Sequence, residues 1–72
     1  MSNDIVNRPA HYNTRSTETI HYIQEGMTPV EFRGYLEGNV IKYFSRFKHK
    51  GEPLQDLQKA RWYLDKLIGQ YE

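Results

Sequence analysis

The sequence predicts a small all-α domain of three to four helices, preceded by an extended N-terminal arm and assembled as an oligomer. Apolar residues recur every three or four positions in three stretches, which is the helical period. Glycine and proline residues separate these stretches, and no segment shows the apolar–polar alternation of a strand. A chain of 72 residues forms one domain. We divide it into an arm over residues 1–16 and a helical domain over residues 17–72.

The arm carries few apolar side chains and shows no helical period. Its asparagines, its proline and Ser16 favour turns and extended backbone. The run from Arg8 to Asn13 combines cationic, aromatic and amide side chains that dock well on a protein surface. We therefore expect an extended arm that is at least partly ordered.

A short first helix is expected over residues 17–25. Ile20, Ile23 and Met27 follow at helical spacing, and Gly26 stands where a C′ glycine ends a helix. The signal for the start of the second helix is stronger. Thr28 can cap that helix, and Glu31 closes a capping box.

An apolar stripe continues from there to about residue 48. Gly34 and Gly38 weaken its first half, and Asn39 is able to cap a new start. One kinked helix and two short helices both fit this pattern, and we favour a break near Gly38. The apolar residues after the break are expected to point into the core; they are Val40, Phe44 and Phe47.

Pro53 suits the first turn of a last helix, whose apolar face is wide. Its members are Leu54, Leu57, Ala60, Leu64, Leu67, Ile68 and Tyr71. If Leu57 and Leu64 mark the buried direction, Trp62 projects about 140° away from Leu57, among polar residues. A large ring there predicts a second buried surface. A subunit contact is favoured over a platform that stacks on a nucleobase.

Composition excludes several classes of protein. With no cysteine there is no disulfide framework, and a net charge of +1 makes direct nucleic-acid binding by bulk charge unlikely. No apolar run approaches the roughly 20 residues of a membrane span, and no secretory signal is visible, so we expect a soluble intracellular protein. The sequence also lacks phosphate-binding glycine loops and metalloprotease or serine-hydrolase motifs.

No metal site is predicted, because the three histidines are scattered along the chain. The acidic residues show no spacing that singles out a magnesium site. We expect them in ordinary ion pairs, such as Asp56 with Lys59.

The best candidate site lies on the helical stretch after Gly38. Helical spacing places Asn39, Lys42, Arg46 and His49 on one stripe, with Lys50 at its edge. Like charges four residues apart repel, so an acidic neighbour or an anionic ligand is needed beside them. Arginine offers a planar fork to phosphate, and lysine a point charge. The alternative interpretation is that these basic side chains are simply exposed to solvent and bind no ligand.

Several motifs of the chain occur in the order found in a known family. They are RPAHYN (8–13), FRGY (32–35), GNVIKY (38–43), HKG (49–51) and DLQKARWYL (56–64). Together they resemble a phage and prophage family of unknown function, which includes the small nucleotide kinase of T7-like coliphages. That kinase phosphorylates deoxynucleoside monophosphates without a phosphate-binding glycine loop, and it is oligomeric.

The resemblance implies a phage-encoded, self-associating, nucleotide-handling helical domain in the cytoplasm of the infected bacterium. Matching positions supply the candidate ligand residues. For phosphate these are Arg8, Lys42, Arg46 and Lys50; for stacking on a base or hydrogen bonding to it they are His11, Tyr12, Asn39 and Trp62. No catalytic residue is assigned.

Two functions remain open at this point. The first is binding of a nucleotide or nucleotide-derived phosphate ligand, extended to phosphotransfer if magnesium bridges the phosphates. The alternative is a non-enzymatic phage protein that binds a host protein or sequesters a nucleotide defence signal. The sequence does not decide whether the protein is an enzyme.

Overall fold

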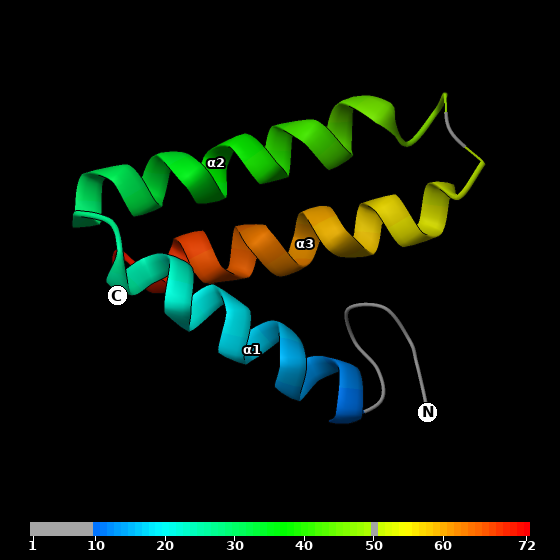
Figure 1. Ribbon diagram of the computed structural model, residues 1–72. Helices are drawn as coiled ribbons and strands as arrows, with labels where there is room; N and C mark the ends of the chain where they lie inside the picture. The colour runs from blue at the N-terminus through cyan, green and yellow to red at the C-terminus, as the bar shows by residue number, and fades with distance from the viewer. Residues whose placement is uncertain (1–9, 50) are drawn as a thin grey trace.

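The computed structural model describes the backbone of residues 10–49 and 51–72, and the side chains of residues 18–49 and 51–72. Within these ranges the chain forms three helices and no strand: α1 (Ala10–Glu25), α2 (Pro29–Arg46) and α3 (Pro53–Gly69). Figure 1 shows α2 and α3 running antiparallel as a hairpin, with α1 packed obliquely against it. The predicted all-α class is confirmed.

The first helix is longer than the sequence indicated. α1 begins at Ala10, so the prediction of an extended chain over residues 10–16 is wrong, whereas residues 1–9 of the predicted arm lie outside the described residues. Asparagine, serine and threonine are only weakly unfavourable inside a helix. Once the packed turn around Ile20 has formed, adding further turns needs no new nucleation.

The predicted start of α2 is confirmed atom by atom. The backbone N–H of Glu31 donates to Thr28 Oγ1 at 3.1 Å, and the backbone N–H of Thr28 donates to Glu31 Oε1 at 2.9 Å. This reciprocal pair is a capping box, and Pro29 occupies the first turn. Pro53 opens α3 in the same position, as expected.

The predicted break near Gly38 is wrong, because α2 is continuous from Pro29 to Arg46. A Cβ added at Gly34 or Gly38 would meet no atom within 4 Å, so both glycines lie on an open side of the helix. Packing of the opposite side therefore outweighs their weak helix propensity. Asn39 does not cap a new helix: its side-chain Nδ2 donates to the backbone carbonyl of Tyr35 at 3.0 Å.

The core lies where the three helices meet. Ile20 of α1 and Phe32 and Leu36 of α2 form its buried centre, and Ala60 of α3 is also buried. Half-buried side chains surround that centre: Ile23, Met27, Tyr35, Trp62, Tyr63 and Leu67.

The buried direction predicted for α3 is right for Ala60, which is buried, and for Leu67, which packs against the core, and wrong for the other residues of the leucine-rich side. Trp62 packs against the core cluster, whereas Leu57, Leu64 and Ile68 are 36%, 42% and 47% exposed. On α2, Phe44 is 60% exposed and does not point into the core. α3 is apolar over more than one side, and the side with the larger rings faces α1 and α2.

Candidate functional site

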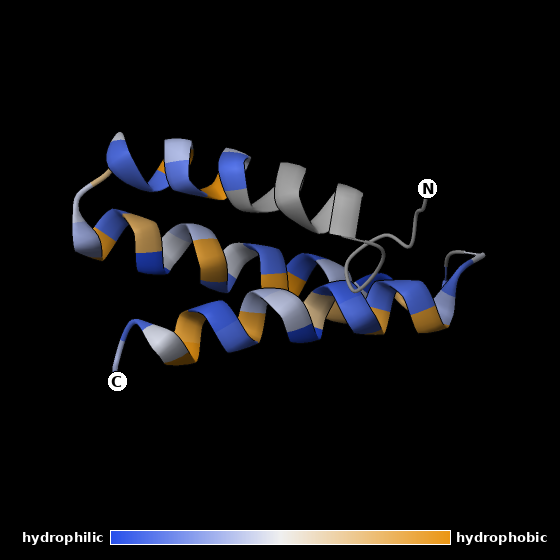
Figure 2. Cartoon of the chain, turned by 90° about the horizontal axis from the view of Figure 1, so that it is seen from below, coloured by the Kyte–Doolittle hydropathy of each residue, from blue (hydrophilic) through white to orange (hydrophobic). Residues whose placement is uncertain are grey.

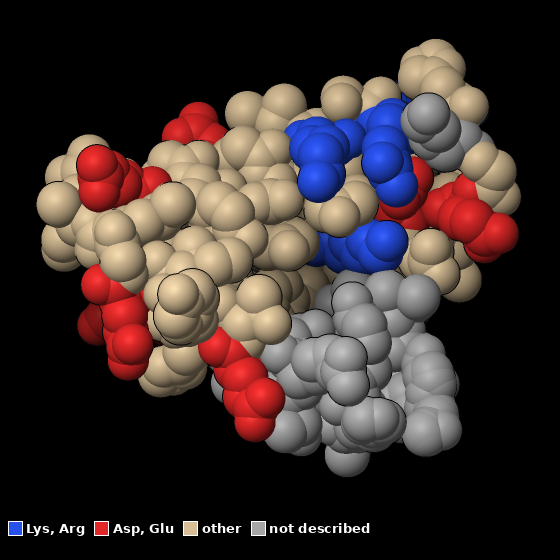
Figure 3. Space-filling view, in the orientation of Figure 1, with Lys and Arg blue, Asp and Glu red and all other residues tan. Residues whose placement is uncertain are grey.

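The site lies where the end of α2 meets the start of α3. The Nζ atoms of Lys42 and Lys59 lie 4.7 and 5.2 Å from the ring centroid of Tyr43, and the Cζ atom of Arg46 lies 5.1 Å from it. We call Lys42, Arg46 and Lys59 the basic cluster. Figure 3 shows the positive side chains gathered on this part of the surface. Contacts of this kind attract a cation to the face of an aromatic ring, so Tyr43 organises three positive charges.

Tyr43 is itself held by other rings. It stacks on Tyr63, with centroids 5.9 Å apart and planes at 11°. Tyr63 in turn meets Trp62 edge-on at 5.0 Å and Tyr35 edge-on at 6.4 Å. Both of these rings, like Tyr63, pack against the buried core. The chain of rings therefore connects the basic cluster to the buried core.

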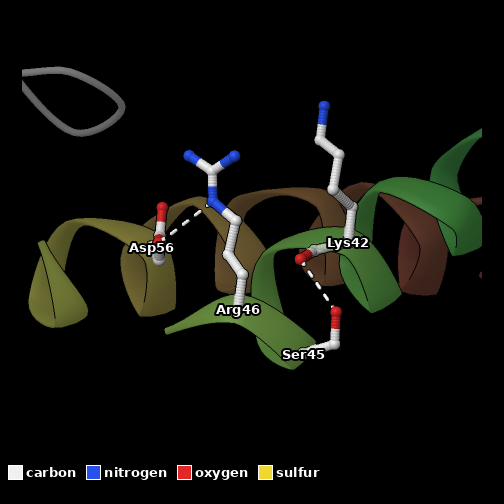
Figure 4. A network of polar contacts seen from close by, with 4 residues as sticks. All are labelled: Lys42, Ser45, Arg46 and Asp56. Atoms are coloured by element: carbon white, nitrogen blue, oxygen red, sulfur yellow. Dashed lines mark hydrogen bonds and ion pairs between the residues drawn. The ribbon is translucent and has the colours of Figure 1, made fainter. Parts of the chain in front are cut away.

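Asp56 orients one member of the cluster. Its carboxylate is 1% exposed, and Oδ2 accepts a hydrogen bond from Arg46 Nε at 3.1 Å. Figure 4 shows the Nε of Arg46 turned to Asp56, while the terminal nitrogens extend in the same direction as the Lys42 ammonium. Because Nε alone pairs with Asp56, the terminal nitrogens of Arg46 are left for another acceptor.

The same contact stabilises the charged form of Arg46. The hydrogen bond that Arg46 donates to Asp56 raises the pKa of Arg46 above its ordinary value, against the opposing effect of desolvation, and the negative charge of Asp56 adds to the rise. An arginine side chain is positive at every physiological pH in any case, so the contact matters for the orientation of the guanidinium rather than for its charge. The other carboxylate oxygen of Asp56, Oδ1, is buried and has no hydrogen-bond partner among the described residues.

The cluster keeps more positive charge than its surroundings neutralise. Asp56 pairs with Arg46 rather than with Lys59, the ion pair the sequence suggested, and no described carboxylate pairs with Lys42 or Lys59. The predicted repulsion between Lys42 and Arg46 is thus relieved on the Arg46 side only. Three cations and one carboxylate leave an excess of two positive charges, which suits an anionic ligand.

The structure brings together two of the predicted phosphate residues, Lys42 and Arg46. Asn39 is half-buried, and Trp62 carries the Lys66 ammonium 5.6 Å above its ring. The remaining candidates cannot be placed: Arg8 and Lys50 lie outside the described residues, as do the side chains of His11 and Tyr12. Their ligand roles, and those of Asn39 and Trp62, stay predictions.

Sequence reasoning missed the part of the site that α3 contributes. Asp56, Lys59 and Tyr63 recur three and four residues apart, so they share one side of the helix. The sequence shows that periodicity, but the leucine-rich side of the helix is more apolar and therefore predicts the wrong buried side. Tyr43 was missed although it ends the GNVIKY motif, because the sequence does not show that Lys42, Arg46 and Lys59 all lie over its ring.

No metal centre is visible in the described part of the chain, where no group of three or more histidine, aspartate or glutamate side chains is positioned to hold an ion. In the same ranges, no helix is both long and apolar enough to cross a membrane.

A family of proteins of unknown function, DUF3310, matches residues 6–65 of the chain. The chain belongs to the DUF3310 family. This confirms the resemblance inferred from the sequence motifs. All four residues around Tyr43 (Lys42, Arg46, Asp56 and Lys59) lie inside the matched region.

Two phage proteins are similar to this DUF3310 chain over 62 residues. The gene 1.7 protein of Enterobacteria phage T3 is 40% identical, over 81% of this chain and 38% of its own length. The nucleotide kinase gp1.7 of Escherichia phage T7 is 39% identical, over 81% of this chain and 32% of its own length. The chain thus spans about a third of the length of these relatives. No solved structure matches it.

Proposed function

We propose that the basic cluster binds the phosphate of a nucleotide or of a nucleotide-derived ligand. One observation carries the proposal: three cations surround a single ring, and only one of them has a carboxylate partner among the described residues. Two unneutralised charges so close together repel each other. An anion placed between them removes that repulsion and supplies acceptors for their N–H groups.

The donors suit phosphate in particular. The terminal nitrogens of Arg46 offer the planar fork that binds two phosphate oxygens at once. Lys42 and Lys59 come from different helices, so an anion between them is held from two sides. Arg46 is oriented beforehand by Asp56, which reduces the side-chain entropy lost on binding.

The relatives point to the same class of ligand. One of the two similar phage proteins is named a nucleotide kinase, and its match to this chain covers 32% of its own length. The proposal is for binding. Phosphotransfer requires a donor and an acceptor together, with magnesium bridging the phosphates, whereas the described residues supply one basic cluster.

Recognition of the base is assigned to the residues the sequence predicted. Trp62 and Tyr12 are the candidates for stacking, while Asn39 and His11 are the candidates for hydrogen bonds. Trp62 is the most informative of these, because its ring is half-buried beside Tyr63 and joins the ring system that holds Tyr43.

The test is a thermal-shift and calorimetric titration with deoxynucleoside monophosphates, dinucleotides and cyclic nucleotides, with and without magnesium. A ligand at about 100 times its Kd stabilises the fold by about 2.7 kcal/mol. In a domain of this size, that raises Tm by roughly 10 °C or more. A folded protein whose Tm no member of the panel changes would contradict the proposal.

Variants locate the site. Lys42→Ala combined with Lys59→Ala removes both unpaired cations and leaves the Arg46–Asp56 contact intact. We expect affinity to fall by roughly 100-fold or more, since hydrogen bonds to charged groups contribute about 1.5–3 kcal/mol each. The matched control is Lys48→Ala combined with Arg61→Ala, which removes the same charge at exposed positions elsewhere and leaves affinity within a few-fold. Equal losses in both double variants would show a general charge effect instead of a site.

A further inference from the structure

An open groove lies along the second half of α3, beside the basic cluster and not part of it. Its volume is about 470 Å³. Five of the described residues line it: Trp62, Asp65, Lys66, Gly69 and Gln70. We call it the Trp62 groove. Small-molecule sites usually have volumes of roughly 300–1,000 Å³, so the groove has room for a nucleobase together with its sugar.

The Trp62 groove lies on the same side of α3 as one member of the basic cluster. Helical spacing places Trp62 and Gly69 within about 80° of Lys59 around the helix axis. The exposed Leu64 is about 160° from Trp62 by the same spacing. Figure 2 shows hydrophilic and hydrophobic segments alternating along α3, as expected for a helix with a polar groove side and an apolar opposite side.

The groove and the basic cluster are also close together along the helix. Trp62 follows Lys59 by three residues, a rise of about 4.5 Å. The ring of Tyr43, at the centre of the cluster, stacks on Tyr63 at 5.9 Å, and Tyr63 meets Trp62 at 5.0 Å. The centroids of Tyr43 and Trp62 are therefore at most about 11 Å apart, the sum of these two distances. One nucleotide spans a comparable distance from its phosphate to the far edge of its base.

The ring of Trp62 can receive a planar base. Tyr63 stands almost perpendicular to this ring, at 84°, and does not stack on it. The side chain above the ring is Lys66, whose Nζ atom lies 5.6 Å from the ring centroid. A lysine side chain is flexible, so it can move aside while a base stacks on the indole. Its ammonium group then donates to an acceptor at the edge of the base.

The other groove residues suit the edge of a base better than a second phosphate. Gln70 is half-buried, and its amide offers both a donor and an acceptor. Asp65 is exposed at the rim, about 120° around the helix axis from Lys59, and its negative charge opposes an anion there. Gly69 keeps part of the groove free of side chains, because a Cβ added to it would meet no atom within 4 Å.

We propose that the Trp62 groove holds the base of the nucleotide whose phosphate lies in the basic cluster. The inference rests on the proposed function and adds the course of the ligand, from Lys59 toward the C-terminal end of α3. It assigns contacts with the base to Trp62, Lys66 and Gln70, of which the last two were not among the residues predicted from the sequence. The cluster then binds any ligand with a phosphate, while the groove adds affinity only for a ligand with a base.

The experiment compares deoxynucleoside 5′-monophosphates with deoxyribose 5-phosphate, which has the same sugar and phosphate and no base. We expect wild-type affinity for the nucleotides to be roughly 5- to 150-fold higher, the usual effect of stacking one base on an aromatic ring. Trp62 is the only tryptophan of the chain, so its fluorescence reports the groove directly. Nucleotides at saturation should quench this emission, and deoxyribose 5-phosphate should leave it unchanged.

Gly69→Gln fills the groove without removing any side chain. Glutamine is a better helix former than glycine, so the variant should fold. We expect it to lose both the higher affinity for nucleotides and the quenching, while its affinity for deoxyribose 5-phosphate stays at the wild-type value. Gly34→Gln is the matched control, because Gly34 lies on α2 with equally open surroundings. It should bind both ligands as the wild type does.

Equal wild-type affinity for the two ligands, or nucleotide binding without a change in Trp62 emission, would overturn the proposal. Nucleotide binding by Gly69→Gln at wild-type strength would overturn it as well. In these cases the phosphate site still stands, because deoxyribose 5-phosphate binds. If neither ligand binds, the proposed function fails, and the inference fails with it. If circular dichroism shows that Gly69→Gln is unfolded, Gly69→Ala replaces it, and the emission test on the wild type is unaffected.

Discussion

The two sides of the α2–α3 hairpin differ in burial and in function. The inner side, toward α1, holds the buried Phe32 and Leu36, and its ring system continues from the core to Tyr43 and the basic cluster. The outer side holds large apolar residues that remain 36–69% exposed: Ile41, Phe44, Leu54, Leu57, Leu64 and Ile68. The greater hydrophobicity of the outer side therefore does not make it the core. The inner side is buried because rings and α1 pack there, and this packing also positions the site.

The largest difference between the two sides should appear in stability. Leu36 is 0% exposed and Leu64 is 42% exposed. We expect Leu36→Ala to lower the free energy of unfolding by about 2–5 kcal/mol, since it leaves a cavity in the core. Leu64→Ala should cost less than about 1 kcal/mol in protein dilute enough to be monomeric. Urea denaturation measures both, and equal costs would show that both sides are core.

A second prediction separates the function of the inner side from its stability. Asp56→Asn should weaken ligand binding by roughly tenfold, about 1.4 kcal/mol, because the neutral amide orients Arg46 less strongly. The free energy of unfolding should not fall, since the carboxylate is buried with Oδ1 unpaired and burying a charge is unfavourable. Calorimetric titration and thermal melting provide the two readouts.

Asp65→Asn is the control for that variant. It lies on the same helix at an exposed position and should change neither affinity nor stability. If Asp56→Asn instead unfolds the protein, Asp56 stabilises the hairpin, and its role in orienting Arg46 is secondary.

The smallest predicted effect is a change in stability at Gly38, on the open side of α2. Gly38→Ala should stabilise the protein by about 1 kcal/mol, because alanine is the better helix former and nothing lies within 4 Å of the added Cβ. Gly26→Ala, just beyond the end of α1, should bring no such gain. A destabilising Gly38→Ala would mean that this side is covered in solution.

Local signals predicted the helix boundaries that depend on local chemistry. The Thr28–Glu31 capping box, the end of α1 before Gly26 and the start of α3 at Pro53 are all observed. The two helix starts are set by hydrogen bonds or by backbone limits within a few residues of the boundary. α1 ends before Gly26 in a turn whose backbone N–H groups bond three residues back, and no described glycine has a positive φ. The extension of α1 to Ala10 and the continuity of α2 through Gly38 depend on packing and propagation, which local propensity does not report.

The orientation of α3 could not be read from hydrophobic periodicity. Leu57, Leu64 and Ile68 form a more apolar stripe than the buried side, where Asp56 and Ala60 lie. Hydrophobic periodicity identifies the apolar face of a helix. It does not show whether other parts of the same chain bury that face. For the same reason, the sequence predicted Lys42 and Arg46 together on one helix but missed Lys59, Asp56 and Tyr63 on the next.

The most direct test of the central claim is to map ligand binding on both sides of the hairpin at once. Amide spectra of isotopically labelled protein would be recorded during titration with deoxynucleoside monophosphates. The account predicts that saturation shifts the amide signals around Lys42, Tyr43, Arg46 and Lys59, and leaves those around Leu64 unchanged. Shifts confined to the outer side, or the absence of any saturable shift, would contradict it.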